Sequence, residues 1–402
     1  MITKADLSYL TPGGAQTLSK MSCRYPPNYP KLLQGGKGGR VKDGKGHEFI
    51  DLIAGLGAVG VGYCNPALNE AAERQMRRGV SFSLPTETEY LAAKKLTELV
   101  PWTEMWKFGK NGTDGTVMAV RAARAYTGRD HIVTVGYNGC ADVFEIKGTR
   151  NAGIPKSLEN YIHKAKYNDL ESFQQGPLPA CILLEPMVFE YPRYNFLIRL
   201  REYCTANGII LIFDEVVTGG RFEQFTASRY FGVVPDLIVL GKAISGGFPL
   251  CAVGGTRHFM EVFERNDFFA SSTFGGEAVS LAVFLETADI LVKTEARRIV
   301  NGRRIKASFN EAFSGTTAIC EGYPTRLNFK FPSDAHKYLF WQDMCSLGVL
   351  VGYTNFIMSD HTEADVFHIV NSIKDSAQVL KQFWSAPEAA FKGALPTPAL
   401  RN

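Results

Sequence analysis

The sequence lacks the signatures of metal sites and of disulfide frameworks. Its eight cysteines are scattered without a C-x-x-C pair, and its seven histidines show neither H-E-x-x-H nor another metal-binding spacing. We therefore expect no metal, and we expect reduced thiols in a cytoplasmic protein. Five cysteines lie in apolar surroundings and are expected in the core: Cys64, Cys140, Cys181, Cys204 and Cys251.

A strong charge of one sign and long apolar runs are missing as well. The 402 residues include 44 basic and 40 acidic ones, and a net charge of +4 is too small to indicate nucleic acid or an anionic membrane as a partner. No uncharged apolar run reaches the roughly 18 residues of a membrane span. Residues 1–6 do not begin an apolar signal region. These absences favour a cytoplasmic protein of ordinary globular composition.

Motifs of nucleotide-binding enzymes are absent or out of context. No G-x-x-x-x-G-K-[ST] sequence occurs, which removes most of the case for a P-loop ATPase. Residues 55–60 match G-x-G-x-x-G, but Asn65-Pro66 separate them from the next helical pattern, so we interpret the match as coincidental. An NAD-dependent oxidoreductase is therefore a distant alternative.

The sequence does contain short apolar runs that alternate with helical patterns. The alternation predicts an α/β fold with a mostly parallel sheet between helices. Residues 197–207, closed by Asn207-Gly208, predict one of the helices. Four runs predict buried strands, over residues 131–135, 181–185, 209–213 and 237–240.

The remaining segments predict the domain organisation. Residues 1–50, rich in Gly, Pro and Lys, are expected to form an irregular arm that belongs to a small α+β domain together with residues 288–402. Residues 51–287 form the expected large domain. The tail from Ser385 onward is rich in Ala and Pro and is expected to be a loose end.

A carboxylate and an amine stand where two of the predicted strands end. Asp214 follows the run 209–213, and Lys242 follows the run 237–240 and one glycine. Because ligands collect at the carboxyl ends of parallel strands, we expect both side chains in one crevice. A buried Asp with a Lys is what pyridoxal phosphate (PLP) chemistry needs: the Lys forms the Schiff base, and the Asp keeps the pyridine nitrogen protonated.

Three further segments offer groups that suit such a cofactor. Asn111, Gly112 and Thr113 precede a helical pattern and offer N–H groups and a hydroxyl to a phosphate, although plain N-capping by Thr113 is the alternative. Tyr137, after the strand 131–135, can lie flat on a planar ring, although an ordinary turn also explains it. Thr273 offers a second hydroxyl, although a loop with a helix cap explains it too.

Taken in order along the chain, these motifs resemble the class III, fold type I PLP-dependent aminotransferases, most of all the glutamate-1-semialdehyde aminomutase branch. The resemblance covers nearly the whole chain. It rests on Pro12-Gly13-Gly14 at the start, on Asn111-Gly112-Thr113-Asp114, and on residues 121–129, which match R-x-A-R-A-Y-T-G-R. The order of the motifs along the chain also matches this family: the anion loop, Tyr-x-Gly, Glu-Pro, Asp-Glu-Val, Lys and then Thr-Phe-Gly-Gly.

The resemblance implies PLP as cofactor and a role for each matching residue. Lys242 would be the Schiff-base lysine and proton shuttle, and Asp214 the partner of the pyridinium. Thr273 would reach the phosphate in the neighbouring subunit, which implies a homodimer with shared sites. The remaining implied contacts are Asn111, Gly112 and Thr113 on the phosphate, Val216 and Tyr137 on the two ring faces, and Glu190 near the phenolic oxygen.

The chain departs from the aminomutase pattern in the segments that face the substrate. The family sequences S-P-V-R, Ser-Trp-Gly, Y-H-G-H and S-G-N-P are replaced by residues 17–20, 55–57, 137–140 and 274–277. We therefore expect amino transfer between a donor and a carbonyl acceptor, with an intramolecular aminomutase as the alternative. Lys20 replaces the Arg of S-P-V-R and is expected to bind an anionic substrate group, unless it is a surface lysine. A catalytically silent binding protein is disfavoured because Lys242 is present.

Overall fold

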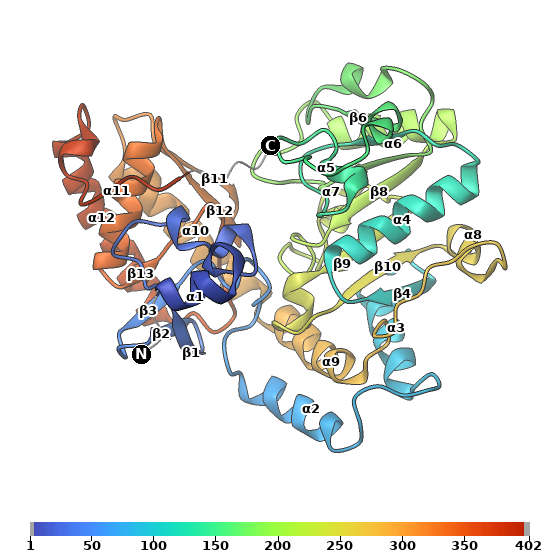
Figure 1. Cartoon of the computed structure of the whole chain (residues 1–402), viewed down its shortest axis with the longest axis horizontal. Coiled ribbons are helices and arrows are strands. Elements are labelled where there is room, and N and C mark those ends of the chain that lie inside the picture. The colour runs from blue at the N-terminus through green and yellow to red at the C-terminus, as the bar shows by residue number, and fades with distance from the viewer. Residues whose placement is uncertain (1–3, 398–402) are drawn as a thin grey trace. The chain divides into compact units, whose positions relative to one another are not determined.

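The computed structural model describes residues 4–397, which form two compact units (Figure 1). One unit combines the described residues up to Asn65 with those from Thr294 onward, and the other is Pro66–Lys293. The chain therefore begins in the first unit, builds the second and then returns to the first. The domain boundaries expected after residues 50 and 287 lie near these transitions and remain predictions.

A seven-stranded sheet forms the centre of the second unit, in the order β4-β10-β9-β8-β7-β5-β6. Neighbouring strands from β9 to β6 are parallel, whereas β10 is antiparallel to both β9 and β4. The mostly parallel α/β fold predicted from the apolar runs is therefore confirmed. The strands are β4 (Met105–Gly109), β5 (Ile132–Thr134), β6 (Ile162–Lys164), β7 (Cys181–Leu184), β8 (Ile210–Glu215), β9 (Leu237–Gly241) and β10 (Cys251–Gly255).

Helices cover both faces of this sheet. Successive side chains of a strand point to opposite faces, so one strand can pack against a helix on each side. In β8, Ile212 packs in one hydrophobic cluster with α4 (Gly112–Thr127), and Phe213 packs in another with α6 (Phe196–Asn207). Figure 1 shows α4 lying over β9 and β10. The other α-helices of this unit are α2 (Pro66–Met76), α3 (Glu87–Leu99), α5 (Asp142–Glu145), α7 (Ala227–Phe231), α8 (Arg257–Met260) and α9 (Ala278–Lys293).

Early and late segments of the described chain together build the first unit. In its four-stranded sheet, β1-β2-β3-β13, the late strand β13 (Val349–Leu350) pairs in parallel with the early strand β3 (Glu48–Asp51). The same unit contains a separate three-stranded sheet, in the order β11-β12-β14. The further elements are β1 (Leu33–Lys37), β2 (Arg40–Asp43), β11 (Ile319–Tyr323), β12 (Arg326–Lys330), β14 (Asn355–Phe356), α1 (Lys4–Leu10), α10 (Glu295–Ala312), α11 (Asp334–Ser346) and α12 (Glu363–Gln382).

The described part of the C-terminal tail, residues 385–397, is docked on the first unit, so the expectation of a loose end is wrong for these residues. Gln342 donates to the Lys392 carbonyl and accepts from the Lys392 N–H, each at 2.8 Å. The Thr397 N–H donates to the carbonyl of Cys23 at 2.9 Å, and Arg24 donates to the carbonyl of Thr397 at 3.1 Å. Residues distant in sequence thus bind the tail, which its composition cannot reveal.

Two cysteines expected in the core are exposed. Cys64 and Cys140 are exposed, whereas Cys181, Cys204 and Cys251 are buried. The two exposed thiols lie in irregular segments, where apolar neighbours in sequence do not share a buried face.

Within residues 4–397, no helix is long and apolar enough to cross a membrane. In the same range, no group of three or more His, Cys, Asp or Glu side chains could hold a metal ion.

Candidate active site

Asp214 and Lys242 lie at the carboxyl ends of two neighbouring parallel strands. Asp214 is paired with Val239 between β8 and β9, and Lys242 directly follows Gly241, the last residue of β9. Ligands of parallel α/β sheets bind at this edge. Lys242 is close enough for its charge to stabilise the charged form of Asp214. The structure therefore brings together the two residues on which the sequence analysis placed the chemistry.

The Asp214 carboxyl is buried, with 5% of the residue exposed. Asn138 Nδ2 donates to its Oδ2, and the Val216 N–H donates to its Oδ1, both at 3.2 Å. Burial and the nearby Glu185 carboxylate raise the pKa of Asp214 to about 6, against the hydrogen bonds and the charge of Lys242. At neutral pH the carboxyl is thus mainly charged in an apolar strand end, where a positive partner stabilises it.

The backbone of Lys242 is strained. Its φ is +47°, in the left-handed region that residues other than glycine rarely enter. It opens a short 3-10 helix, η6 (Lys242–Ser245), in which the buried Ser245 hydroxyl donates to the Lys242 carbonyl at 2.7 Å. Strain of this kind persists only where the surrounding structure holds it, which is common at active sites.

The turn before α4 presents unused N–H groups. Asp114 Oδ2 accepts from the N–H groups of Lys110 at 2.8 Å and Asn111 at 3.1 Å, and Asn111 Oδ1 accepts from the Asp114 N–H at 3.2 Å. Asn111 is therefore the N-cap, and the alternative of N-capping by Thr113 is wrong. None of the described residues accepts from the N–H groups of Gly112 and Thr113. At the positive end of a helix such N–H groups suit an anion, and we call residues 110–113 the anion turn.

Two glycines let this turn pack against the strand ends. A Cβ atom on Gly112 would lie 2.7 Å from Val216 Cγ1, so a larger residue would displace Val216. A Cβ atom on Gly139, whose φ is +122°, would lie 2.7 Å from Thr113 Oγ1. The Thr113 hydroxyl accepts from the Cys140 N–H at 3.1 Å. The anion turn, the loop after β5 and the end of β8 therefore form one continuous wall.

Asn138 is a site residue that the sequence analysis did not assign. It is only 2% exposed, and its carbonyl accepts from Thr116 Oγ1 at 2.7 Å, which fixes the loop that also carries Tyr137. Its Oδ1 is buried and has no hydrogen-bond partner among the described residues. The only sequence signal for Asn138 was an amide side chain beside Tyr137, after a predicted strand. That signal could not reveal Asp214 as the hydrogen-bond partner.

The other expected site residues are more exposed. Glu190 is about half exposed and forms an ion pair with Arg193 at 2.6 Å. Tyr137 is also about half exposed, and Thr273 is exposed in the segment before α9. Lys20 is exposed and belongs to the first unit. The cofactor and substrate contacts expected of these residues remain predictions.

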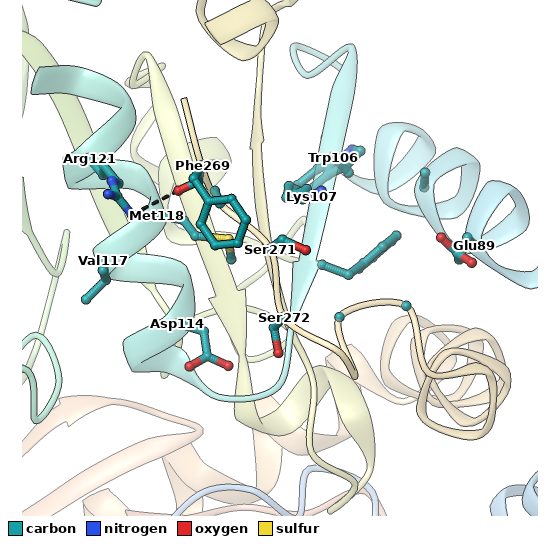
Figure 2. A pocket seen from close by; sticks show the side chains of 16 residues that line it. Glu89, Trp106, Lys107, Asp114, Val117, Met118, Arg121, Phe269, Ser271 and Ser272 are labelled. Atoms are coloured by element: carbon teal, nitrogen blue, oxygen red, sulfur yellow. Dashed lines mark hydrogen bonds between the residues drawn. The ribbon is translucent and has the colours of Figure 1, made fainter. Parts of the chain in front are cut away.

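A pocket of about 470 Å³ adjoins the anion turn. Figure 2 shows Asp114 and Arg121 of α4 on one side, Trp106 of β4 on another, and Ser272 at its edge. Arg121 Nη1 donates to the Phe269 carbonyl at 2.9 Å, which holds the segment 269–276 beside α4. The segment that contains Thr273 thus borders an open space next to the anion turn.

The residues at the strand ends fit a phosphorylated pyridine cofactor. The N–H groups of Gly112 and Thr113 suit its phosphate, and the buried carboxyl of Asp214 suits a protonated ring nitrogen. Lys242 supplies an amine at the next strand end. The unpaired Oδ1 of Asn138 adds a polar position to the same wall.

Relatives named as an aminotransferase and as an aminomutase match most of the chain. The family model of the class III aminotransferases matches residues 24–318. The 3-aminobutyryl-CoA aminotransferase of Cloacimonas acidaminovorans is 31% identical over 94% of this chain and 96% of its own length. The glutamate-1-semialdehyde 2,1-aminomutase of Syntrophobacter fumaroxidans is 34% identical over 71% of each chain.

The fold also matches solved structures of this kind. A transaminase with PLP bound superimposes with a TM-score of 0.87 and is 26% identical, over 95% of this chain and 99% of the other. Family model, sequence relatives and fold agree with the fit of the strand-end residues to the cofactor. The chain therefore belongs to the class III aminotransferases, a family of PLP-dependent enzymes.

Proposed function

We propose that this enzyme transfers an amino group between a small amino donor and a small carbonyl acceptor, and that Lys242 and Asp214 carry the chemistry. One observation supports this most strongly. A buried, mainly charged Asp214 lies beside the Lys242 strand end, and the anion turn packs against Val216, two residues further along. Carboxylate, amine and anion site thus occur within one unit of the protein.

PLP, when bound, supplies a carbonyl carbon that bonds to amines and a ring that accepts electrons. Lys242 Nζ holds the cofactor and then moves a proton at the substrate carbon that bears the amino group. Asp214 keeps the ring nitrogen protonated, because a buried carboxylate favours a charged partner. The N–H groups of Gly112 and Thr113, with the side chains of Asn111 and Thr113, hold the phosphate.

Three further residues complete the proposed cofactor site. Val216, which is 6% exposed, provides an apolar surface for one ring face. Tyr137, which is 44% exposed, provides an aromatic surface for the other. Glu190 is proposed to provide a polar side chain near the phenolic oxygen of the cofactor.

We propose a cytoplasmic homodimer with shared sites. Thr273 is exposed, and its segment also exposes Phe269 and Phe274, which are 69% and 56% accessible. Exposed aromatic residues around a hydroxyl suit a surface that a second copy covers. Thr273 would then contact the phosphate bound by the partner. The eight cysteines are all free, which supports a reducing compartment.

Intramolecular transfer is the second candidate, because a relative with 34% identity is named as an aminomutase. Transfer between two molecules is favoured by the departures in the substrate-facing segments. It is also supported by the aminotransferase relative that matches 94% of this chain.

A screen of donor and acceptor pairs tests this proposal. The purified, PLP-loaded protein is given amino acids, 3-aminobutyryl-CoA or another β-amino compound, together with a 2-oxo acid, and products are measured by mass spectrometry. Equal amounts of a new carbonyl compound and a new amino acid indicate transfer. Conversion of glutamate-1-semialdehyde alone, with no added donor, would instead establish the aminomutase.

A further inference from the structure

Lys110, the first residue of the anion turn, uses all of its side-chain donors inside the protein. Its Nζ donates to Glu277 Oε2 at 2.8 Å, to the Pro249 carbonyl at 3.0 Å and to Ser280 Oγ at 3.2 Å. A lysine ammonium group has three N–H donors, so these three acceptors occupy them. A lysine beside a phosphate site is usually a candidate ligand, but this one already has a complete set of partners.

These acceptors come from two other segments of the proposed site. Pro249 lies in the Lys242 segment, residues 242–250, which precedes β10. Glu277 directly follows residues 269–276, which we call the Thr273 segment, and Ser280 lies in the first turn of α9. The ammonium group thus joins the anion turn, the Lys242 segment and the Thr273 segment.

The ion pair between Lys110 and Glu277 is largely shielded from water. The two side chains are only 16% and 10% exposed. Burial opposes the charge of Glu277, but hydrogen bonds from Lys110 and Ser280 hold its pKa below the ordinary value. The second carboxylate oxygen of Glu277 accepts from the Val279 N–H at 2.7 Å, so the carboxylate also caps α9. Such a pair has a fixed geometry, unlike a mobile pair on the surface.

Tight packing beside the ion pair keeps the Thr273 segment in place. A Cβ atom on Gly275 would lie 3.0 Å from the Phe108 carbonyl oxygen of β4, and one on Gly276 would lie 2.7 Å from the Glu89 carboxyl carbon. At the other end of the contact, Asp114 accepts from the Lys110 N–H at 2.8 Å. Both the backbone and the side chain of Lys110 are therefore held.

We infer that Lys110 is a positioning residue that holds the anion turn, the Lys242 segment and the Thr273 segment in their relative places, and is not itself a phosphate ligand. This inference rests on the proposed function, which assigns the anion turn to the phosphate. It follows that the PLP affinity of the enzyme depends on a pair of side chains that do not touch PLP.

Glu277→Gln separates the two possible roles of Lys110 by the sign of its effect. As a positioning residue, Lys110 loses its charged anchor in this variant, and the dissociation constant of PLP should rise at least fivefold. As a phosphate ligand, Lys110 would be released towards the phosphate, and the constant should stay the same or fall. The constant is measured by titrating the cofactor-free protein with PLP and following its absorbance.

The double variant Lys110→Met with Glu277→Gln removes both charges and leaves neither buried alone. We expect PLP to bind at least tenfold more weakly. Hydrogen exchange of the cofactor-free protein should become faster in residues 109–115, 243–250 and 273–281. Faster exchange in the first range alone would overturn the inference. The matched control, Lys147→Met with Glu159→Gln, removes an ion pair of 2.8 Å that is more exposed and should change neither measurement.

Thr113→Val distinguishes a failure of this inference from a failure of the proposed function. If Thr113→Val weakens PLP binding and Glu277→Gln does not, only the role of Lys110 is wrong. If Thr113→Val leaves PLP binding unchanged, the phosphate site is wrong, and the inference fails with it.

Discussion

Replacing Asp214 by Asn should stabilise the cofactor-free protein while it disables the enzyme. The pKa of Asp214 is raised from an ordinary 3.8 to about 6, so its charged form destabilises the fold. At about 1.4 kcal/mol per pKa unit, this costs on the order of 3 kcal/mol at pH 8. Asn carries no charge, but it offers one carbonyl to the two donors Asn138 and Val216 and loses one hydrogen bond, worth about 1 kcal/mol. The net gain is about 2 kcal/mol.

The advantage of the Asp214→Asn substitution should depend on pH with a definite sign. Between the ordinary pKa of 3.8 and the raised value of about 6, the folded native protein binds more protons than the unfolded chain. The native protein therefore gains stability relative to Asp214→Asn as the pH falls through this window. Titrating groups that do not interact with Asp214 are shared by both proteins and cancel in the difference; Glu185 and Lys242, which interact with it, do not cancel fully.

Urea unfolding of both cofactor-free proteins, from about pH 8 down to about pH 5, measures this difference. The variant should unfold at higher urea concentration at the alkaline end and lose most of that advantage at the acid end, which lies inside the titration window. In the control variant Asp236→Asn, the ion pair with Arg201 at 2.9 Å and a hydrogen bond from the Leu211 N–H at 2.7 Å are weakened. That variant should be less stable than the native protein at alkaline pH. A stability difference for Asp214→Asn that does not change with pH would refute the reasoning.

Four further substitutions test individual assignments. Lys242→Ala should lose turnover and should yield no lysine-bound cofactor after borohydride reduction; cofactor fixed on another lysine would contradict this. Gly112→Ala should weaken PLP binding at least tenfold in a titration, because its Cβ would lie 2.7 Å from Val216 Cγ1. Thr273→Ala should weaken PLP binding in a protein that sediments as a dimer, and a fully active monomer would disprove the shared site. Lys20→Met should raise KM for an acidic substrate roughly tenfold with an unchanged cofactor spectrum, because a charged hydrogen bond is worth about 1.5–3 kcal/mol; an unaltered KM would make Lys20 a surface residue.

The part of the site that the sequence predicts consists of residues with local signals. An apolar run ends at Asp214, another ends just before Lys242, and Gly112 and Thr113 open a helical pattern. In a parallel sheet, such strand ends meet at one edge, so local patterns suffice to bring these residues to the same place. The α/β fold could be predicted for the same reason.

The part that could not be predicted depends on contacts between distant residues. Asn138 and Asp214 are 76 positions apart, and Lys110 and Glu277 are 167 apart. Before the fold is known, nothing in the neighbourhood of Lys110 distinguishes a phosphate ligand from a buried ion-pair partner. The docked tail is a similar case, because a single residue, Gln342, binds both backbone groups of Lys392.

The parallel pairing of β3 with β13 sets an order of events on the ribosome. Val349 must be synthesised before it can pair with Ile50, whereas all of Pro66–Lys293 emerges earlier and without interruption. At translation rates of 5–20 residues per second, the early strands wait roughly 15–60 s for their partner. During that interval, Ile50 and Leu52, which are buried in the finished protein, are open to chaperones and to other nascent chains. The parallel edge of β3 is thus completed only after the whole second unit has been synthesised, whereas its antiparallel edge to β2 needs no late partner.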